Sequence, residues 1–305
     1  MKIIGDVGEG AIEEFVKSIK KGPFACLNPD SNLYEEYVGE DSLKVVEYGK
    51  TLADSIALNE PDIFDCAVYQ AYLDMCRTVR GVKEKAKDER ELIGGSLRGY
   101  FKASGAEDSC VHERKLADWR KSEEGFDEWH KCVIETVKDK ANQLTVGQIQ
   151  KLINMSFKYL YCCEDMREEK SFIGLFENCH MALDAYTLAW LKRVDKASYE
   201  MIPKDSNGSR SWSKINDIDT YSRIVDATRK RCKEKKWPNR RRPFYAEFFI
   251  WPNESSIAAL HAVIKNAESV VVPDELRKYV GKVNDLKKSL DKLGELEEEM
   301  RGLYA

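Results

Sequence analysis

Lysine and aspartate side chains inside otherwise apolar stretches are the residues of this sequence best suited to chemistry. Lys151 and Lys158 lie two helical turns apart in the most apolar part of the chain, and Asp184 precedes a second apolar run. A lysine withdrawn from water usually forms an ion pair or loses its proton more easily. A neutral lysine amine can attack an electrophilic carbon and form a Schiff base. The pattern therefore predicts either amine chemistry in a cleft or, if both lysines lie on a solvated edge, no chemistry.

The segment that must position the two lysines is predicted to be a helix over residues 147–163. At about 100° per residue it has one broad apolar face, and the rest of its circumference is only partly polar. A helix that is apolar nearly all round is normally buried. Asp184 is well placed as the N-cap of a second helix over 185–192, a role that is sufficient to explain it without catalysis.

Two short motifs in this region resemble a known enzyme family. The run Gln150-Lys-Leu-Ile-Asn-Met-Ser-Phe-Lys-Tyr159, followed by His180-Met-Ala-Leu-Asp184 at the head of a helix, is similar to the catalytic stretch of the helix-hairpin-helix DNA glycosylases. The archaeal 8-oxoguanine glycosylase branch is the most similar. The resemblance implies that Lys151 attacks the sugar of a flipped-out damaged nucleotide and that Asp184 assists. Lys158 is the alternative nucleophile.

The resemblance covers residues 144–192 and departs from the family at two places. Leu144-Thr-Val-Gly147 stands where a Leu-Pro-Gly-Val-Gly type hairpin is expected, and Ala182 stands where a proline commonly precedes the apolar-Asp pair. The first departure weakens the contact with DNA phosphate that the family's hairpin would make. The second affects the expected position of Asp184.

A basic stretch over residues 229–242 is the predicted nucleic-acid contact. Dense local positive charge is typical of phosphate binding, and an aromatic residue within it can stack on bases. A basic helix end that complements its own C-terminal dipole is the alternative interpretation. The predicted DNA-binding residues are Arg229, Lys230, Arg231, Lys233, Lys235, Lys236, Trp237, Arg240, Arg241 and Arg242.

Composition narrows the class of protein. The chain has 305 residues, a formal net charge of −4 and 43% hydrophobic residues, so any polyanion site must be a local patch. Neither a signal peptide nor an apolar run long enough to cross a membrane is present, and the 9 cysteines suit reduced thiols. We expect a cytoplasmic protein without a membrane partner.

No cofactor or metal is predicted. The Walker, dinucleotide, Gly-x-Ser-x-Gly and His-Glu-x-x-His motifs are all missing from the sequence. A zinc site made by Cys162, Cys163, Cys179 and His180 is the one metal alternative, but adjacent ligands do not suit the usual spacing.

The predicted fold is all-α, a multi-helix globular bundle with a helix-hairpin-helix glycosylase-like core. We predict an N-terminal helical region over 1–142, a central core over 143–270 and a C-terminal extension over 271–305.

Leu276 to Met300 follow a heptad-like pattern, which indicates either a terminal helix packed on its own domain or a homodimer through 276–303. Further predictions are helices over 9–21, 42–58, 63–87, 112–142 and 215–232, a turn at 94–96, a loop over 203–213, and a buried strand or extended core segment at 248–252.

These observations give two hypotheses. The first is a DNA-acting enzyme of the base-excision type, a DNA glycosylase and AP lyase that uses Lys151, with Asp184 assisting. The second is a non-enzymatic helical protein that binds nucleic acid or oligomerises.

Overall fold

The computed structural model describes residues 9–19, 24, 63–78, 86–101, 122–141, 143–163, 166–167, 172, 174–234 and 242–269. Within these ranges the chain is built of helices and loops, and the one extended pairing is an isolated bridge between Lys204 and Arg210. The predicted all-α class is therefore confirmed for the described residues.

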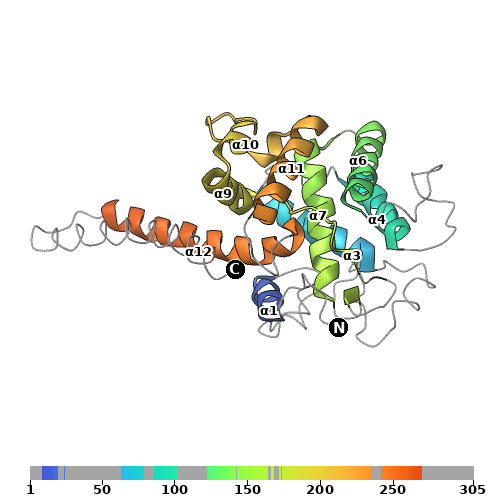
Figure 1. Cartoon of the computed structure of the whole chain (residues 1–305), viewed down its shortest axis with the longest axis horizontal. Helices are drawn as coiled ribbons and strands as arrows, with labels where there is room; N and C mark the ends of the chain where they lie inside the picture. Colours follow the sequence, from blue (N-terminus) through green and yellow to red (C-terminus); the bar gives the residue numbers. More distant parts are fainter. Residues whose placement is uncertain are drawn as a thin grey trace, which may run out of the picture.

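The helices, in chain order, are coloured from blue to orange in Figure 1. They are α1 (Glu9–Lys17), α3 (Ile63–Thr78), α4 (Lys87–Phe101), α6 (Glu123–Lys140), α7 (Val146–Cys162), α9 (Ala185–Val194), α10 (Lys196–Glu200), the 3-10 turn η3 (Trp212–Lys214), α11 (Ile218–Glu234) and α12 (Pro243–Ser269).

Helix α7 passes through the centre of the body, with α4 and α6 on one side and α9, α10 and α11 on the other (Figure 1). Every residue of α7 is buried, as a helix that is apolar nearly all round predicts. Its start is fixed by a capping box, in which Thr145 and Gln148 each accept a hydrogen bond from the other's backbone N–H. Because Lys151 and Lys158 are buried with the rest of the helix, the solvated-edge interpretation of these lysines is wrong.

An aromatic cluster packs α7 against α4 and α6. Tyr100 contacts Phe126 and Phe157 edge to face, with ring centroids 5.8 and 5.2 Å apart, and Trp129 lies 4.8 Å from the same ring. Each such pair stabilises by about 0.5–1.5 kcal/mol beyond its burial. The apolar core is continuous and includes residues on both sides of the predicted boundary at 142/143.

The predicted turn at 94–96 is wrong, because these residues lie within α4. A Cβ at Gly94 would come within 2.3 Å of the Asp65 carboxylate oxygen on α3. Gly94 is therefore explained by the close packing of α3 on α4, and the local turn preference of Gly-Gly-Ser is overridden.

The predicted strand or extended segment at 248–252 is also wrong, because it lies within α12 and includes Pro252. Phe244 and Phe248 are four residues apart and both are fully buried, so helical periodicity places them on one face. Short apolar runs do not separate strand from helix by pattern alone.

Other boundaries differ by some residues. Helix α3 covers the first part of the helix predicted over 63–87, of which residues 79–85 are not described, and α1 and α6 fall inside the predicted helices at 9–21 and 112–142. The predicted loop over 203–213 is mostly non-helical, and α11 corresponds to the helix predicted over 215–232. The predicted helix at 42–58 and the heptad segment 276–303 lie outside the described residues.

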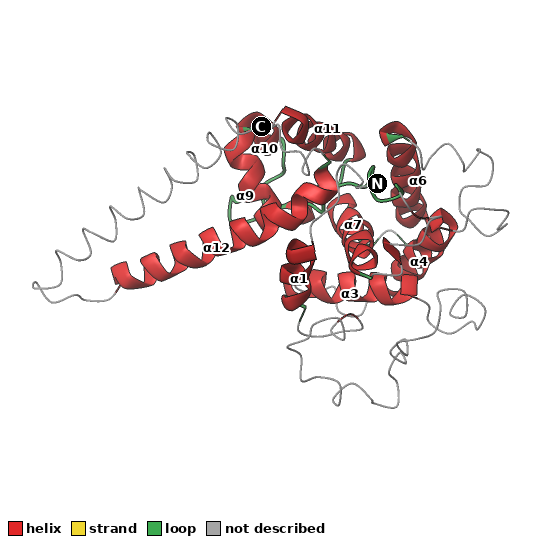
Figure 2. Cartoon of the chain, turned by 60° about the horizontal axis from the view of Figure 1, so that its bottom comes forward, coloured by secondary structure: helices red, strands yellow, loops and turns green. Residues whose placement is uncertain are grey.

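Helix α12 begins against the body beside α9 and then extends well beyond it, as two views show (Figures 1 and 2). Its first turns supply Glu247, which is completely buried, and its outer turns expose Ala258, Ala259 and Ala262. The inner part of α12 therefore contributes to the core next to α7.

Candidate active site

Lys151 and Asp184 form a buried ion pair. The Lys151 Nζ lies 2.8 Å from Asp184 Oδ2, and only 7% and 10% of the two side chains are exposed. Lys151 comes from the start of α7, and Asp184 is the N-cap of α9, where its Oδ1 accepts hydrogen bonds from the backbone N–H groups of Tyr186 and Thr187. The structure therefore brings together the two residues that the resemblance implies act as a pair.

The charge state of this pair follows from its contacts. Burial raises the pKa of Asp184, but the Lys151 ammonium and the backbone N–H of Thr187 lower it, and the net pKa is below its ordinary value. Asp184 is therefore ionised at neutral pH and serves Lys151 as a counter-ion.

The 3-10 turn η3 covers the ion pair. The Trp212 ring centroid lies 5.9 Å from Lys151 Nζ, and the turn is held on the head of α7 because Gly147 N donates to Ile215 O at 2.8 Å. A Cβ at Gly147 would lie 1.8 Å from the Trp212 carbonyl oxygen. Gly147 thus permits a close approach of backbone to helix, and its N–H is already used within the protein.

Lys158 has a different environment. Its Nζ lies 2.9 Å from Glu247 Oε1 on α12, and both side chains are only 1% exposed. The rings of Phe15, Phe248 and Trp251 surround the ammonium at 4.2, 4.9 and 5.9 Å from their centroids. Lys158 is thus enclosed by a carboxylate and three aromatic rings.

A buried non-helical segment, residues 179–184, connects these features and ends at Asp184; we call it the connecting segment. Gln150 on α7 accepts from the backbone N–H of Leu183 and donates to the carbonyl of the same residue, at 3.2 and 3.0 Å. Glu247 Oε2 accepts from Ala182 N at 2.7 Å, and Asn154 donates to Met181 O at 3.3 Å. Side chains of α7 and α12 thus satisfy backbone groups that a neighbouring strand would satisfy in a sheet.

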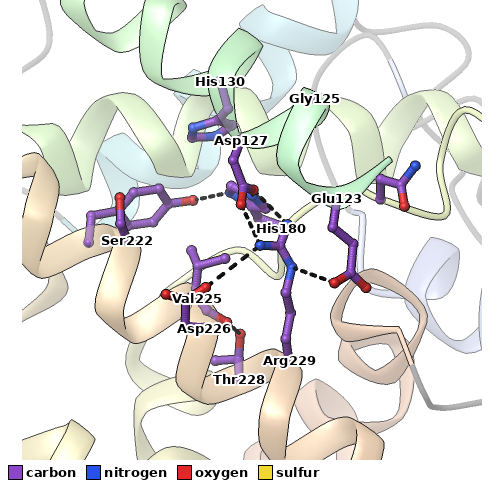
Figure 3. A network of polar contacts seen from close by, with 12 residues as sticks. Glu123, Gly125, Asp127, His130, His180, Ser222, Val225, Asp226, Thr228 and Arg229 are labelled. Atoms are coloured by element: carbon purple, nitrogen blue, oxygen red, sulfur yellow. Dashed lines mark hydrogen bonds and ion pairs between the residues drawn. The ribbon is translucent and has the colours of Figure 1, made fainter. Parts of the chain in front are cut away.

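A polar cluster surrounds His180 in the connecting segment (Figure 3), and no sequence motif predicted it. His180 contacts Asp127 on α6 at 2.6 Å through Nε2 and the Tyr221 hydroxyl at 2.8 Å through Nδ1. Arg229 from α11 donates to both oxygens of Asp127, each at 2.6 Å. His130 on α6 also contacts His180, and their ring centroids are 4.6 Å apart.

Protonation in this cluster is controlled by burial. Burial lowers the pKa of His130, and the neighbouring His180 lowers it further. Burial lowers the pKa of His180 more than Asp127 raises it. Burial raises the pKa of Asp127, but hydrogen bonds from His180 and Arg229 reverse this and hold it well below its ordinary range. Both imidazoles are therefore neutral at pH 7, beside an ionised carboxylate.

The described part of the predicted DNA-binding run is paired with acids of the same chain. Arg229 binds Asp127, Arg231 lies 3.2 Å from Asp195 and 2.7 Å from Glu234, and Lys233 and Arg242 lie 2.8 and 2.7 Å from Glu123. Lys230 is 69% exposed and 3.9 Å from Glu234. Lys235, Lys236, Trp237, Arg240 and Arg241 lie outside the described residues.

A cleft of about 550 Å³ lies between α6 and α11 beside this run. It is separate from Lys151 and Asp184, and carboxylates outnumber cations in its lining, which consists of Glu123, Glu124, Asp127, Asp226, Arg229, Lys230, Lys233 and Glu234. The ion pair and this cleft therefore do not form one basic site.

The proposed zinc ligands do not meet. Within the described ranges no group of three His, Cys, Asp or Glu side chains is placed to hold a metal ion, and the thiols of Cys163 and Cys179 donate to the carbonyls of Tyr159 and Leu175. His180 uses both ring nitrogens for Tyr221 and Asp127. The zinc alternative is therefore wrong for these four residues.

Comparison with known proteins adds no relative: no protein-family model, curated protein or solved structure matches the chain. Each helix in the described part of the chain is either too short or too polar to cross a lipid bilayer.

Proposed function

We propose that the chain is a DNA-acting enzyme of the base-excision type, an N-glycosylase and AP lyase in which Lys151 is the nucleophile. One observation carries the proposal. The Lys151 Nζ lies 2.8 Å from a carboxylate at the head of the next long helix, which is the arrangement that the resemblance over residues 144–192 implies. The proposal includes a helix-hairpin-helix glycosylase-like core around α7 and α9.

The proposed reaction begins when the Lys151 ammonium gives one proton to solvent and becomes the neutral amine. Its nitrogen attacks C1′ of the flipped-out nucleotide, the C1′–N bond breaks, and the departing base takes the bonding electron pair and the amine proton. Opening of the sugar ring, in which O4′ keeps the C1′–O4′ electron pair and takes a proton from solvent, then gives a protonated Schiff base between C1′ and Nζ. Because Asp184 is ionised, its contribution is to stabilise the positive charge that develops at C1′ and on the iminium nitrogen.

The buried position of the pair adds two requirements. Trp212 and η3 must move for a nucleotide to reach Lys151, since the turn covers the pair. DNA phosphate must be held elsewhere than at Gly147, whose N–H is bonded to Ile215. In this proposal the exposed Lys230, together with Lys235, Lys236, Arg240 and Arg241, makes the phosphate contacts.

Borohydride trapping tests the proposal directly. The purified chain is mixed with duplex DNA that carries oxidised, deaminated or abasic sites, reduced, and analysed on a denaturing gel for a covalent complex. We expect a trapped band with the wild type and no band with Lys151→Gln. Lys192 is an exposed lysine on α9, and Lys192→Gln serves as the control that should still give the band.

Asp184→Asn separates the charge of Asp184 from its role as the N-cap of α9. Asparagine caps a helix about as well as aspartate, so the fold is retained while the counter-ion is lost. We expect roughly 10²-fold slower trapping. A band that survives Lys151→Gln but is lost in Lys158→Gln would move the nucleophile, and no band with any of the three substrates would exclude Schiff-base chemistry on them.

The second candidate is a non-enzymatic helical interaction protein. It is favoured by the pairing of both α7 lysines and most described cations of the basic run with carboxylates of the same chain. Under this alternative Lys151→Gln leaves DNA binding unchanged and no variant forms a covalent complex, whereas reversal of charge at Arg240, Arg241 and Arg242 abolishes binding.

A further inference from the structure

The backbone groups of residues 181–183 in the connecting segment are buried, and within the described residues their hydrogen bonds are made by side chains: those of Gln150, Asn154, Thr187 and Glu247. Gln150 is fully buried and uses both ends of its amide. Its Nε2 donates to Gly147 O and Leu183 O, and its Oε1 accepts from Leu183 N and Asn154 Nδ2. Leu183 immediately precedes Asp184, so this two-point contact fixes the residue from which the carboxylate projects.

Glu247 makes the second contact. Its Oε2 accepts from Ala182 N at 2.7 Å, and its Oε1 accepts from Lys158 Nζ at 2.9 Å. With 1% of each side chain exposed, this carboxylate and ammonium meet no solvent and no reactant. The Lys158 ammonium neutralises Glu247, and Glu247 holds the connecting segment two residues before Asp184.

We infer that Gln150 and Glu247 are positioning residues for the Lys151–Asp184 pair, and that Lys158 acts through Glu247 and not as a nucleophile. The inference rests on the proposed function only where it treats the Lys151–Asp184 pair as catalytic. The contacts themselves are those of the protein without DNA. A carboxylate shifted by even one ångström would leave hydrogen-bonding distance of the Lys151 Nζ.

The test measures the titration of Asp184 in the full-length chain. Aspartate is labelled with ¹³C at the carboxyl carbon, and the Asp184 signal is assigned by its loss in Asp184→Asn. In the wild type this carboxylate stays ionised at and below its ordinary pKa. In Gln150→Met we expect the titration midpoint to rise by about 1–3 pH units, because burial remains while the ammonium is no longer aligned.

Ser156→Ala is the matched control on the same helix. Ser156 is fully buried, but its hydroxyl donates to Leu152 O within α7 and makes no bond to the connecting segment. A general loosening of α7 would shift the Asp184 midpoint in both variants, whereas a positioning role shifts it in Gln150→Met alone.

A second pair of variants isolates Glu247 and does not depend on the folding of Gln150→Met. Lys158→Met/Glu247→Gln removes both charges and keeps an acceptor for Ala182 N, whereas Lys158→Met/Glu247→Leu removes that acceptor too. Because the Lys158 charge itself lowers the pKa of Asp184, we expect a small rise of the midpoint in the glutamine variant and a larger rise in the leucine variant. Equal midpoints in these two variants, together with an unchanged midpoint in Gln150→Met, would overturn the inference.

Trapping is recorded in parallel so that the two proposals fail separately. If the Asp184 midpoint moves as expected while no variant, including the wild type, is trapped on DNA, the positioning role stands and the base-excision proposal is rejected. If the wild type is trapped and Gln150→Met is trapped at the same rate with an unmoved midpoint, the positioning role is rejected and the enzyme proposal stands.

Discussion

The Lys158–Glu247 pair and the Lys151–Asp184 pair start from the same helix, two turns apart, and differ in what surrounds them. The first is closed by three aromatic rings and is 1% exposed on each side. The second lies beneath the 3-10 turn η3, retains 7% and 10% exposure, and shares its carboxylate with two backbone N–H groups. Similar ion-pair geometry is thus fully enclosed at one end of α7 and slightly exposed at the other.

The largest difference between the two regions should appear on removal of one lysine. In Lys158→Met, Glu247 stays buried without a counter-ion, which typically costs about 3–5 kcal/mol. The free energy of unfolding in urea measures the loss. Lys158→Met/Glu247→Gln should recover most of it, because neither charge then remains and the glutamine still accepts from Ala182 N; a double variant as unstable as the single one would contradict this account.

Lys151→Met should cost less, about 1–3 kcal/mol, because Asp184 keeps its bonds from Tyr186 and Thr187 and some contact with water. The same urea experiment measures it. If Lys151→Met destabilises the protein as much as Lys158→Met does, the two pairs are equally structural and the contrast between them disappears.

Between pH 8 and 5, acid should weaken the protein through the histidine cluster. His130 and His180 have folded pKa values below their unfolded value of about 6.5, so the unfolded chain binds more protons in acid. Their contribution to stability is complete above about pH 6.5 and is lost as the pH falls below it. Urea unfolding between pH 8 and 5 measures this loss, and His180→Gln should make the dependence shallower.

The smallest expected effect concerns the access of a small reagent to the two buried lysines. Native acetylation by acetic anhydride, read by mass spectrometry, should modify Lys151 more slowly than the exposed Lys192 and should leave Lys158 unmodified until the chain unfolds. Modification of Lys158 at the rate of Lys151 would show that the aromatic enclosure opens as easily as the turn that carries Trp212.

Local features of the sequence predicted the local parts of this arrangement. Burial of α7 followed from its apolar circumference, and the role of Asp184 as N-cap followed from the residue type before an apolar run. The closeness of Lys151 and Asp184 rested on a resemblance alone, because a contact across 33 positions depends on how two helices pack.

Features made by several distant elements could not be predicted. The contacts around His180 join α6, α7, the connecting segment and α11, and no spacing within one element indicates them. The errors at Gly94 and at Phe248 have the same origin. In both cases packing against another helix decides the conformation, whereas the local pattern favoured a turn or a strand.

The connecting segment also has a consequence for the order of folding. Its bonds to Gln150 and Glu247 span 33 and 65 positions, and it has no helix or ladder of its own to form early. Contacts between residues far apart in the sequence cost loop-closure entropy before they contribute to stability. Residues 179–184 should therefore become ordered only after α7 and α12 have docked, which makes them a late step on the folding pathway and leaves a nascent chain without α12 unable to complete them.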